Sequence, residues 1–363
     1  MSNEVINTLE HLPSELFFEI FRFINSYNTY KAFYGLNYRL STLVLTHGMK
    51  YLDLSEINID ECQKILSDID CSQVKTLKLS DKYCDKQINE LLSFDCFPLN
   101  KFQSLHSLTL DSIGLYTIHS TIQQTFHLEH LKVLIIRFRS NLCEEKLVDV
   151  YKIILNDISI RLKSLKVLYL YISESNPIIL TKEYISSSEN LSLIDVNTSL
   201  QYLILSHMRI NDIETILTRF PNLCQLGSIV LLNPLIYDYP LASNLTCCVL
   251  SILESEFVCL VDLLRKCPNL EQLTLDYNPI DVDALDGEQW ENLIVNYLSK
   301  LKQFELFLSV TSATVNEIED LIHMTFSQNK FWIERKAQIT VKKEEIDDSN
   351  HGIRIDTTIE FRI

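Results

Sequence analysis

Glycine is scarce in this chain, with six in 363 residues, each isolated from the others. A phosphate-binding loop needs several glycines close together, because only glycine lets the backbone approach a phosphate closely. We therefore expect neither a nucleotide-binding loop nor a cofactor. The six positions are Gly35, Gly48, Gly114, Gly227, Gly287 and Gly352.

The chain also lacks a long hydrophobic run and paired cysteines. No run of about 18 uninterrupted apolar residues occurs, and residues 1–12 are polar and acidic, unlike a signal segment. None of the ten cysteines forms a C-x-x-C pair, and most lie in apolar contexts, as Cys259 does. This pattern predicts reduced, buried thiols in a cytoplasmic and/or nuclear protein that does not contact membranes.

Positive charge is in deficit. The chain has 32 Lys and Arg against 48 Asp and Glu, a formal net charge of −16. Residues 48–363 hold nearly all of it, with 29 basic and 44 acidic residues. Such a chain repels the phosphates of nucleic acid and of anionic membranes, so neither is predicted as a partner.

No residue pattern typical of catalysis or metal binding stands out. His127 and His130 have only Glu129 beside them, which favours a polar turn over a metal site. The acidic run at 344–348 lacks the alternating oxygen ligands of a calcium loop, and no G-x-S-x-G occurs. We expect no catalytic residues and no metal, that is, a protein that is not an enzyme.

The strongest positive signal is an internal repeat. The pattern apolar-x-x-apolar-x-apolar recurs at intervals of 22 to 35 residues. In its L-x-L part both apolar side chains point to one side of a short strand, which only stacking of equivalent strands can bury. The copies begin at Met49, Val74, Leu105, Leu131, Leu165, Leu200, Leu245, Leu270 and Leu301, with a weaker copy at Leu223.

Helical spacing of apolar residues predicts helices at 59–69, 210–220 and 256–267 between these strands. With them, residues 49–310 resemble an irregular leucine-rich-repeat array, although the Asn or Cys expected after the third apolar position is mostly absent. The resemblance implies an α/β solenoid with a parallel sheet on the concave side and helices on the convex side. An ordinary doubly wound α/β domain is the alternative.

The C-terminal end differs from the repeats. Residues 314–317, TVNE, match a capping box that opens a helix. Residues 331–341 and 352–363 alternate with a period of two, which predicts a β-hairpin. We expect this hairpin to cap the last repeat, whose core would otherwise be exposed.

The N-terminal segment, residues 9–44, is dense in apolar residues. Pro13 and Glu15 suit the first turn of a helix, and Leu16, Ile20 and Phe21 follow at helical spacing. One small helix cannot hide this surface, so two further helices, at about 29–36 and 40–44, are predicted to share it. A unit this short needs a partner or a neighbouring domain to be stable.

Through Leu12-Pro13-Ser14-Glu15-Leu16 and the later apolar positions, this segment resembles the F-box. That family docks on the Skp-type adaptor of SCF ubiquitin ligases. One departure is Leu40, where the family often has Trp. The alternative is a helical cap that only seals the first repeat. The resemblance implies that the adaptor-binding residues are Leu12, Pro13, Glu15, Leu16, Ile20, Phe21, Ile24, Phe33, Leu36 and Leu40.

The residue between the two strand leucines, and the residue two positions further on, point away from the core, towards the predicted concave face. These positions are polar at the ends of the array and apolar or aromatic in its middle, where Tyr and Arg have the composition of a binding hot spot. A register error of one residue would invert this face, and an insertion or the hairpin could cover it. The predicted client-binding residues are Ile135, Arg137, Tyr169, Tyr171 and Ile204.

Three parts are therefore expected: an F-box-like helical segment at 1–47, a solenoid at 48–312 and a cap at 313–363. The expected function is the non-catalytic substrate-recognition subunit of an SCF E3 ubiquitin ligase in protein degradation. It would bind the adaptor, through it a cullin, and an unknown client protein. The alternative is a leucine-rich-repeat scaffold for protein–protein interaction without a ligase role.

Overall fold

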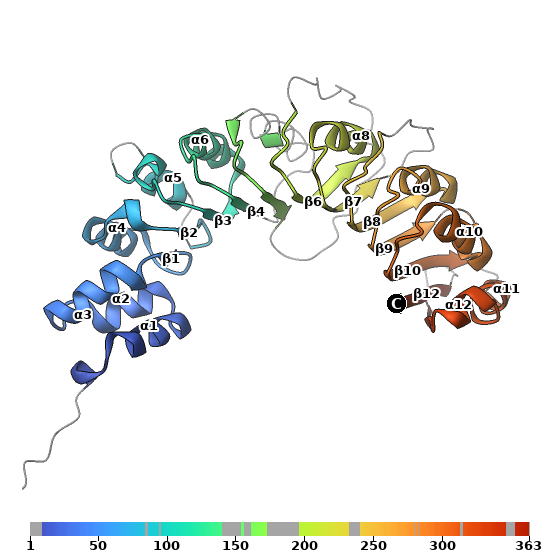
Figure 1. Ribbon diagram of the computed structural model, residues 1–363, viewed down its shortest axis with the longest axis horizontal. Helices are drawn as coiled ribbons and strands as arrows, with labels where there is room; N and C mark the ends of the chain where they lie inside the picture. The colour runs from blue at the N-terminus through green and yellow to red at the C-terminus, as the bar shows by residue number, and fades with distance from the viewer. Residues whose placement is uncertain are drawn as a thin grey trace, which may run out of the picture. The chain divides into compact units, whose positions relative to one another are not determined.

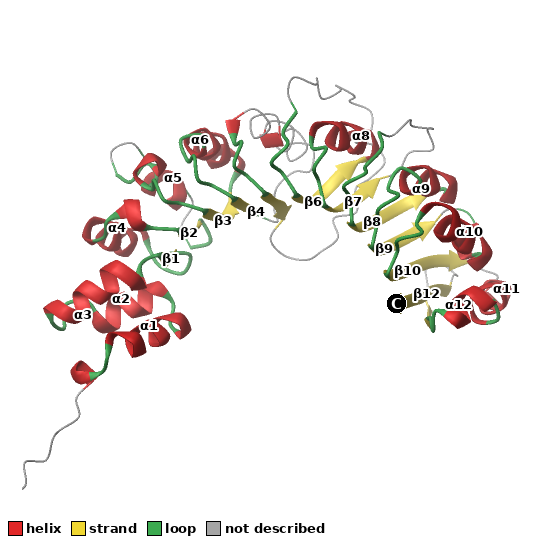
Figure 2. Cartoon of the chain, viewed as in Figure 1, coloured by secondary structure: helices red, strands yellow, loops and turns green. Residues whose placement is uncertain are grey.

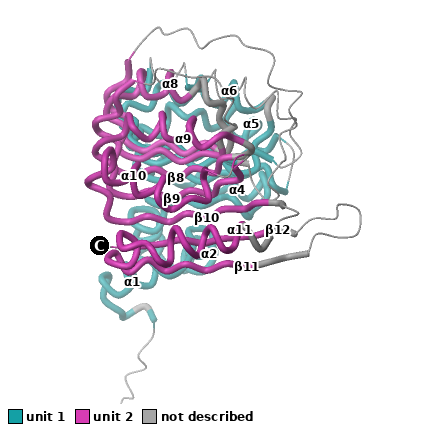
Figure 3. The backbone as a smooth tube through the Cα atoms, turned by 90° about the vertical axis from the view of Figure 1, so that its right-hand side faces the viewer, with its two compact units in different colours: residues 1–180 teal, residues 181–363 magenta. Residues whose placement is uncertain are grey.

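The computed structural model divides the chain into two compact units, residues 1–180 and 181–363, coloured separately in Figure 3. Both contain helices and strands (Figure 2). Within the described ranges no helix is long and apolar enough to cross a membrane. The structure describes residues 9–83, 86–93, 96–139, 154–155, 161–172, 196–231, 240–279, 281, 283–312, 315–345 and 353–362.

The first unit contains a parallel sheet whose strands pair in chain order. Figure 1 shows α4, α5 and α6 on one side of this sheet. The strands are β1 (Tyr51–Asp53), β2 (Thr76–Ser80), β3 (Ser107–Ile113), β4 (Val133–Phe138) and β5 (Val167–Ile172). The helices are α4 (Ile59–Asp68), η3 (Cys71–Gln73), α5 (Gln87–Leu91), η4 (Leu99–Lys101) and α6 (Leu115–Thr125).

Three helices precede this sheet: α1 (Ser14–Phe23), α2 (Ser26–Phe33) and α3 (Tyr38–Leu43). The short helix η1 (Leu9–His11) comes before them and the π-helical turn η2 (Val44–Gly48) after them. Asn25 and Asn37 begin α2 and α3, because each side-chain oxygen accepts a hydrogen bond from the backbone N–H three residues on, at 2.8 Å.

The second unit repeats the parallel arrangement and ends in an antiparallel hairpin. Its parallel strands are β6 (Tyr202–Arg209), β7 (Gln225–Leu231), β8 (Cys247–Ser255), β9 (Gln272–Pro279) and β10 (Gln303–Ser312). Then β12 (Ile353–Arg362) pairs with both β10 and β11 (Gln338–Glu345). The helices are α8 (Ile210–Arg219), α9 (Phe257–Leu264), η6 (Asp283–Leu285), α10 (Gly287–Tyr297), α11 (Val315–Ile322), η7 (His323–Ser327) and α12 (Lys330–Glu334).

Every predicted repeat segment forms a parallel strand, including the weaker copy at Leu223, which leads into β7. The strand leucines are buried in register: Leu77 pairs with Leu108, and both are fully inaccessible. The parallel strands follow chain order within each unit, whereas a doubly wound sheet reverses its order at a switch point. The α/β architecture is thus confirmed, and it is compatible with a solenoid.

Asparagine joins successive turns of the second unit, at a position different from the expected one. The Asn222 side-chain amide, three residues before β7, donates to the Thr198 carbonyl of the preceding turn at 2.8 Å. Asn244 and Asn269 make the same backward contact before β8 and β9, at 2.9 and 2.6 Å. These asparagine contacts therefore lie before the strands, and not after the third apolar residue of each repeat.

The C-terminal hairpin is present, but its predicted first strand begins with a helix. Strands β11 and β12 pair antiparallel, while residues 330–334 form α12. Phe331 and Trp332 are adjacent and both buried, which a strand burying one face cannot achieve. Trp332 contacts the rings of Phe304 and Phe361 at centroid distances of 5.9 and 6.0 Å, so α12 packs on β10 and β12.

We expect Trp332→Ala to lower the free energy of unfolding by about 3–5 kcal/mol, because a large ring inside this aromatic cluster is lost. Urea denaturation followed by circular dichroism measures the change. The matched control is Ile333→Ala, whose side chain is 58% exposed and whose loss should cost below about 1 kcal/mol. Equal losses for the two variants would contradict this account of the cap.

Candidate protein-binding surfaces

Helix α1 has one face inside the N-terminal segment and one face outside it. Phe17 is fully buried, and its ring lies 6.1 Å from that of Phe21 and 5.9 Å from that of Phe33 of α2. On the outer face, Leu16 is 48% exposed and Phe23 is 88% exposed, seven residues apart and therefore on the same side of the helix. The outer face therefore also carries large apolar side chains.

Two more exposed apolar residues lie beside the start of α1. Leu36 is 59% exposed and Tyr38, the first residue of α3, is 89% exposed. The Arg39 guanidinium donates to the Leu12 carbonyl at 2.6 Å, which holds the first turn of α3 against the start of α1. We call these four residues, together with the partly exposed Ile20, the N-terminal apolar surface: Leu16, Ile20, Phe23, Leu36 and Tyr38.

The structure separates the predicted adaptor-binding residues into two groups. Phe33 and Leu40 are 8% and 1% exposed, so they pack inside the segment and leave a partner almost no side chain to contact. In this structure they are core residues that support the surface above them. Exposed or partly exposed are Leu12, Pro13, Glu15, Leu16, Ile20, Phe21, Ile24 and Leu36. Sequence reasoning missed Phe23 and Tyr38, because exposed and buried aromatics share the same helical spacing.

Helix α2, in contrast, packs against the first repeat and forms hydrogen bonds with it. The Ser26 hydroxyl accepts from the Asp53 N–H at 2.8 Å and donates to the Asp53 carbonyl, covering the edge of β1. The Tyr27 hydroxyl donates to the Glu61 carboxylate at 2.7 Å. Helix α2 thus seals the first repeat, which is the role that the alternative interpretation assigns to the whole segment. The outer face of α1 stays uncovered by the described chain.

Tyr30 anchors the other end of α2 to α4. Its hydroxyl donates to the Asp68 carboxylate, and burial together with this hydrogen bond raises the pKa of Tyr30 well above its ordinary value. The neutral phenol is therefore the form that the folded state favours. The contribution of the Tyr30–Asp68 hydrogen bond to stability is present below pH 10 and is lost at higher pH. The reason is that the Tyr30 phenol ionises at a lower pH in the unfolded chain than in the folded one.

A second surface lies on the sheet face opposite the helices, here called the open face. In the first unit, Ile135 pairs with Tyr169 and Arg137 with Tyr171 across β4 and β5. All four are partly exposed, whereas the alternating residues, such as Leu134 and Leu168, are fully buried. The predicted register of these strands is therefore correct, and four of the five predicted client-binding residues lie together.

Arg137 is held by two neighbours on the open face. Its Nε atom donates to the Tyr171 hydroxyl, and its guanidinium lies 5.2 Å from the centre of that ring. Its Nη1 atom is 3.8 Å from the Asp111 carboxylate. The guanidinium and the ring thus form a preorganised polar-aromatic pair, the kind of group that carries binding energy at protein interfaces.

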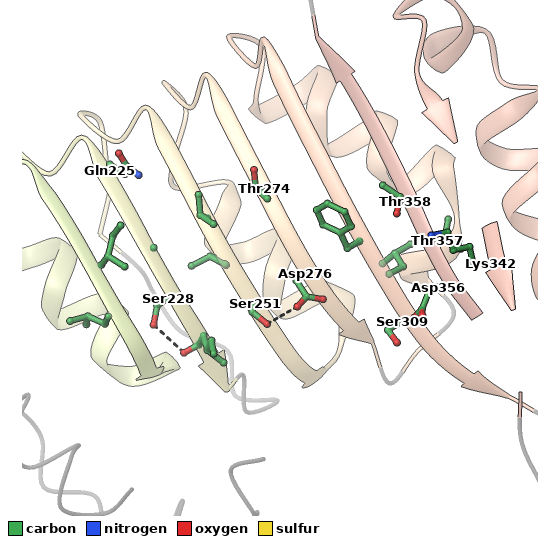
Figure 4. Close-up of a pocket in the computed structure, with 18 residues that line it drawn as sticks. Gln225, Ser228, Ser251, Thr274, Asp276, Ser309, Lys342, Asp356, Thr357 and Thr358 are labelled. Carbon is green, nitrogen blue, oxygen red and sulfur yellow. Dashed lines mark hydrogen bonds between the residues drawn. The ribbon is translucent and has the colours of Figure 1, made fainter. Parts of the chain in front are cut away.

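The fifth predicted residue, Ile204, belongs to the second unit, where it lines a groove of about 780 Å³ on the open face. Gly227 and Val249 continue its floor on the next two strands, and Figure 4 shows Asp276 beside Ser251. Phe307 stands on β10 and is 41% exposed. The groove has an apolar floor with polar groups at its margins.

The described residues offer surfaces rather than a cluster of reactive groups. Within those ranges, no three His, Cys, Asp or Glu side chains gather as a metal site. Burial raises the pKa of the Cys62 and Cys267 thiols to about 12, so both stay protonated and weakly nucleophilic at neutral pH. Compared with known proteins, the chain matches no protein-family model and no curated protein.

We expect Tyr30→Phe to lower the free energy of unfolding by about 1 kcal/mol at pH 7, because Asp68 loses its hydrogen-bond donor. The difference in free energy of unfolding between this variant and the unsubstituted chain should shrink above pH 10. There the unfolded state of the unsubstituted chain is stabilised by ionisation of Tyr30. Thermal unfolding from pH 7 to 11 measures both. Tyr34→Phe is the control, since the ring of Tyr34 stacks on Tyr30 at 4.5 Å and no described group accepts from its hydroxyl. A constant difference across this range would contradict the assignment.

Proposed function

We propose that this protein is the non-catalytic substrate-recognition subunit of an SCF-type ubiquitin ligase. The N-terminal apolar surface would bind the Skp-type adaptor, and through it a cullin, while the open face of the repeats would bind a client protein. The observation that carries the proposal is the uncovered apolar face of α1, in a segment whose sequence resembles the F-box.

The extent of this exposure supports a partner. Single exposed apolar residues are normal, but a cluster marks an interaction site. Burying one such side chain is worth about 1.5–3 kcal/mol. Leu16 and Phe23 on one helix face, with Leu36 and Tyr38 near its start, therefore represent substantial unused binding energy.

The client side of the proposal rests on Ile135, Arg137, Tyr169 and Tyr171 of the first unit and on Ile204 of the second. Tyr171 and Asp111 already hold Arg137, so little side-chain freedom remains to be lost on binding. Ile135 and Tyr169 supply apolar area beside it. No chemical step is assigned to any of them, because the transfer of ubiquitin would take place on other subunits.

We expect the double variant Leu16→Ser/Phe23→Ser to bind a purified Skp-type adaptor about 100-fold more weakly, two side chains each contributing about 1.4 kcal/mol. Titration calorimetry measures the affinity. Thermal stability should change little, because both side chains are largely exposed. A control with matched chemistry is Met324→Ser, which removes a 63% exposed side chain from η7.

The same titration decides between the two functional classes. An unsubstituted chain that does not bind the adaptor, or a double variant that binds it unchanged, would leave a repeat scaffold without a ligase role. Adaptor binding that depends on Leu16 and Phe23 supports the receptor.

For the client, we expect Tyr169→Asp to abolish degradation of the client protein without weakening adaptor binding. The reason is that a carboxylate beside Ile135 opposes apolar contact between this site and the client. Proteomics should find the same proteins accumulating in cells with Tyr169→Asp and in cells with Leu16→Ser/Phe23→Ser. Gln123→Asp on the exposed side of α6 adds the same charge elsewhere and should have no effect. Unchanged client levels with Tyr169→Asp would remove this residue from the client site.

A further inference from the structure

The floor of the groove in the second unit lacks a side chain at one position, Gly227, which is itself buried. In register with it across the parallel strands are Ile204, Val249, Thr274 and Glu305, each with a side chain. The backbone at Gly227 does not require glycine, because its φ lies outside the left-handed region. An added Cβ would meet Ile204 Cγ1 at 3.4 Å and the Val249 carbonyl at 3.6 Å, ordinary contact distances.

The space above Gly227 is bounded by apolar carbon. Ile204 borders it on β6 and Val249, 41% exposed, on β8. A large aliphatic or aromatic side chain from another molecule would fill this space and remove both neighbours from water. Such burial is worth about 1.5–3 kcal/mol.

The side of the groove towards β9 is acidic. Asp276 accepts a hydrogen bond from the Ser251 hydroxyl at 3.1 Å, and no described cation pairs with it. Glu305, in contrast, is neutralised by Arg362 at 3.2 Å. Asp276 is two strands across and two residues along from Gly227, a separation of about 12 Å at ordinary sheet spacing.

The charge of the whole second unit has the same sign. Residues 181–363 contain 14 basic and 27 acidic residues, a net charge of −13 out of −16 for the chain. The one lysine lining the groove, Lys342, lies opposite Asp356 in the strand register, and the two lining carboxylates, Asp276 and Asp356, outnumber it. A cationic partner is therefore attracted to this unit and an anionic one is repelled.

We propose that this groove binds a basic segment of the client protein, with an apolar side chain inserted above Gly227 and a Lys or Arg paired with Asp276. The proposal rests on the receptor function and specifies the client's chemistry. The separation of about 12 Å corresponds to an apolar and a basic residue two to four positions apart in an extended segment.

The test is selection of 12-residue random peptides, displayed on phage, against the purified full chain. The expected consensus is a large apolar residue two to four positions from Lys or Arg. Asp276→Lys should replace the basic residue of the consensus with Asp or Glu. Gly227→Leu should weaken binding of the most enriched synthetic peptide at least about tenfold, a loss of about 1.4 kcal/mol.

The controls isolate the groove from the rest of the chain. Glu214→Lys, on the exposed side of α8, makes the same charge change away from the groove and should leave the consensus unaltered. Gly227→Ala adds only one methyl group at ordinary contact distances and should give a smaller loss, so the test survives if Gly227→Leu disturbs folding.

The proposal is overturned if no consensus appears, if the consensus is acidic or purely apolar, or if Asp276→Lys selects the same peptides as the unsubstituted chain. Unchanged peptide affinity in Gly227→Leu with an intact circular dichroism spectrum also overturns it. Adaptor affinity, measured on the same variants, separates the two proposals. Peptide selection without adaptor binding leaves the groove on a scaffold, and adaptor binding without selection leaves a receptor whose client binds elsewhere.

Discussion

Burial of in-register leucines between parallel strands is the constraint on which both units depend. Leu77, Leu108, Leu134 and Leu168 occupy equivalent places on successive strands of the first unit, and all are fully inaccessible. No single strand can hide its leucines, so each repeat is stable only against its neighbours. The backbone ladder and the side-chain column thus enforce the same register.

A stack of this kind has ends, and each unit covers one in its own way. Helix α2 covers the edge of β1 through Ser26 and reaches α4 through Tyr27 and Tyr30. The last parallel strand, β10, is covered by β12, and Trp332 packs behind the pair. Because α2 covers that edge, Leu16 and Phe23 of α1 remain exposed without weakening the first repeat.

Residues on the open face are also not needed for the core. The stabilising leucines point to the other side of each strand, so residues between them can change without loss of the core. The first unit uses this freedom for the Arg137–Tyr171 pair, and the second for the groove at Gly227. The N-terminal apolar surface and the open face therefore consist of separate residues, and single substitutions can change one without the other.

The sequence alone determined the local features. Strand positions, the helices around 59–69 and 210–220 and the outward-pointing residues follow from periods of two and 3.6, which depend on neighbours in the chain. Only tertiary structure decided which apolar residues of the N-terminal helices are buried, placing Phe33 and Leu40 inside and Phe23 and Tyr38 outside. It also brought Gly227, Asp276 and Phe307 into one groove, because the register that joins strands distant in sequence is set by packing between repeats.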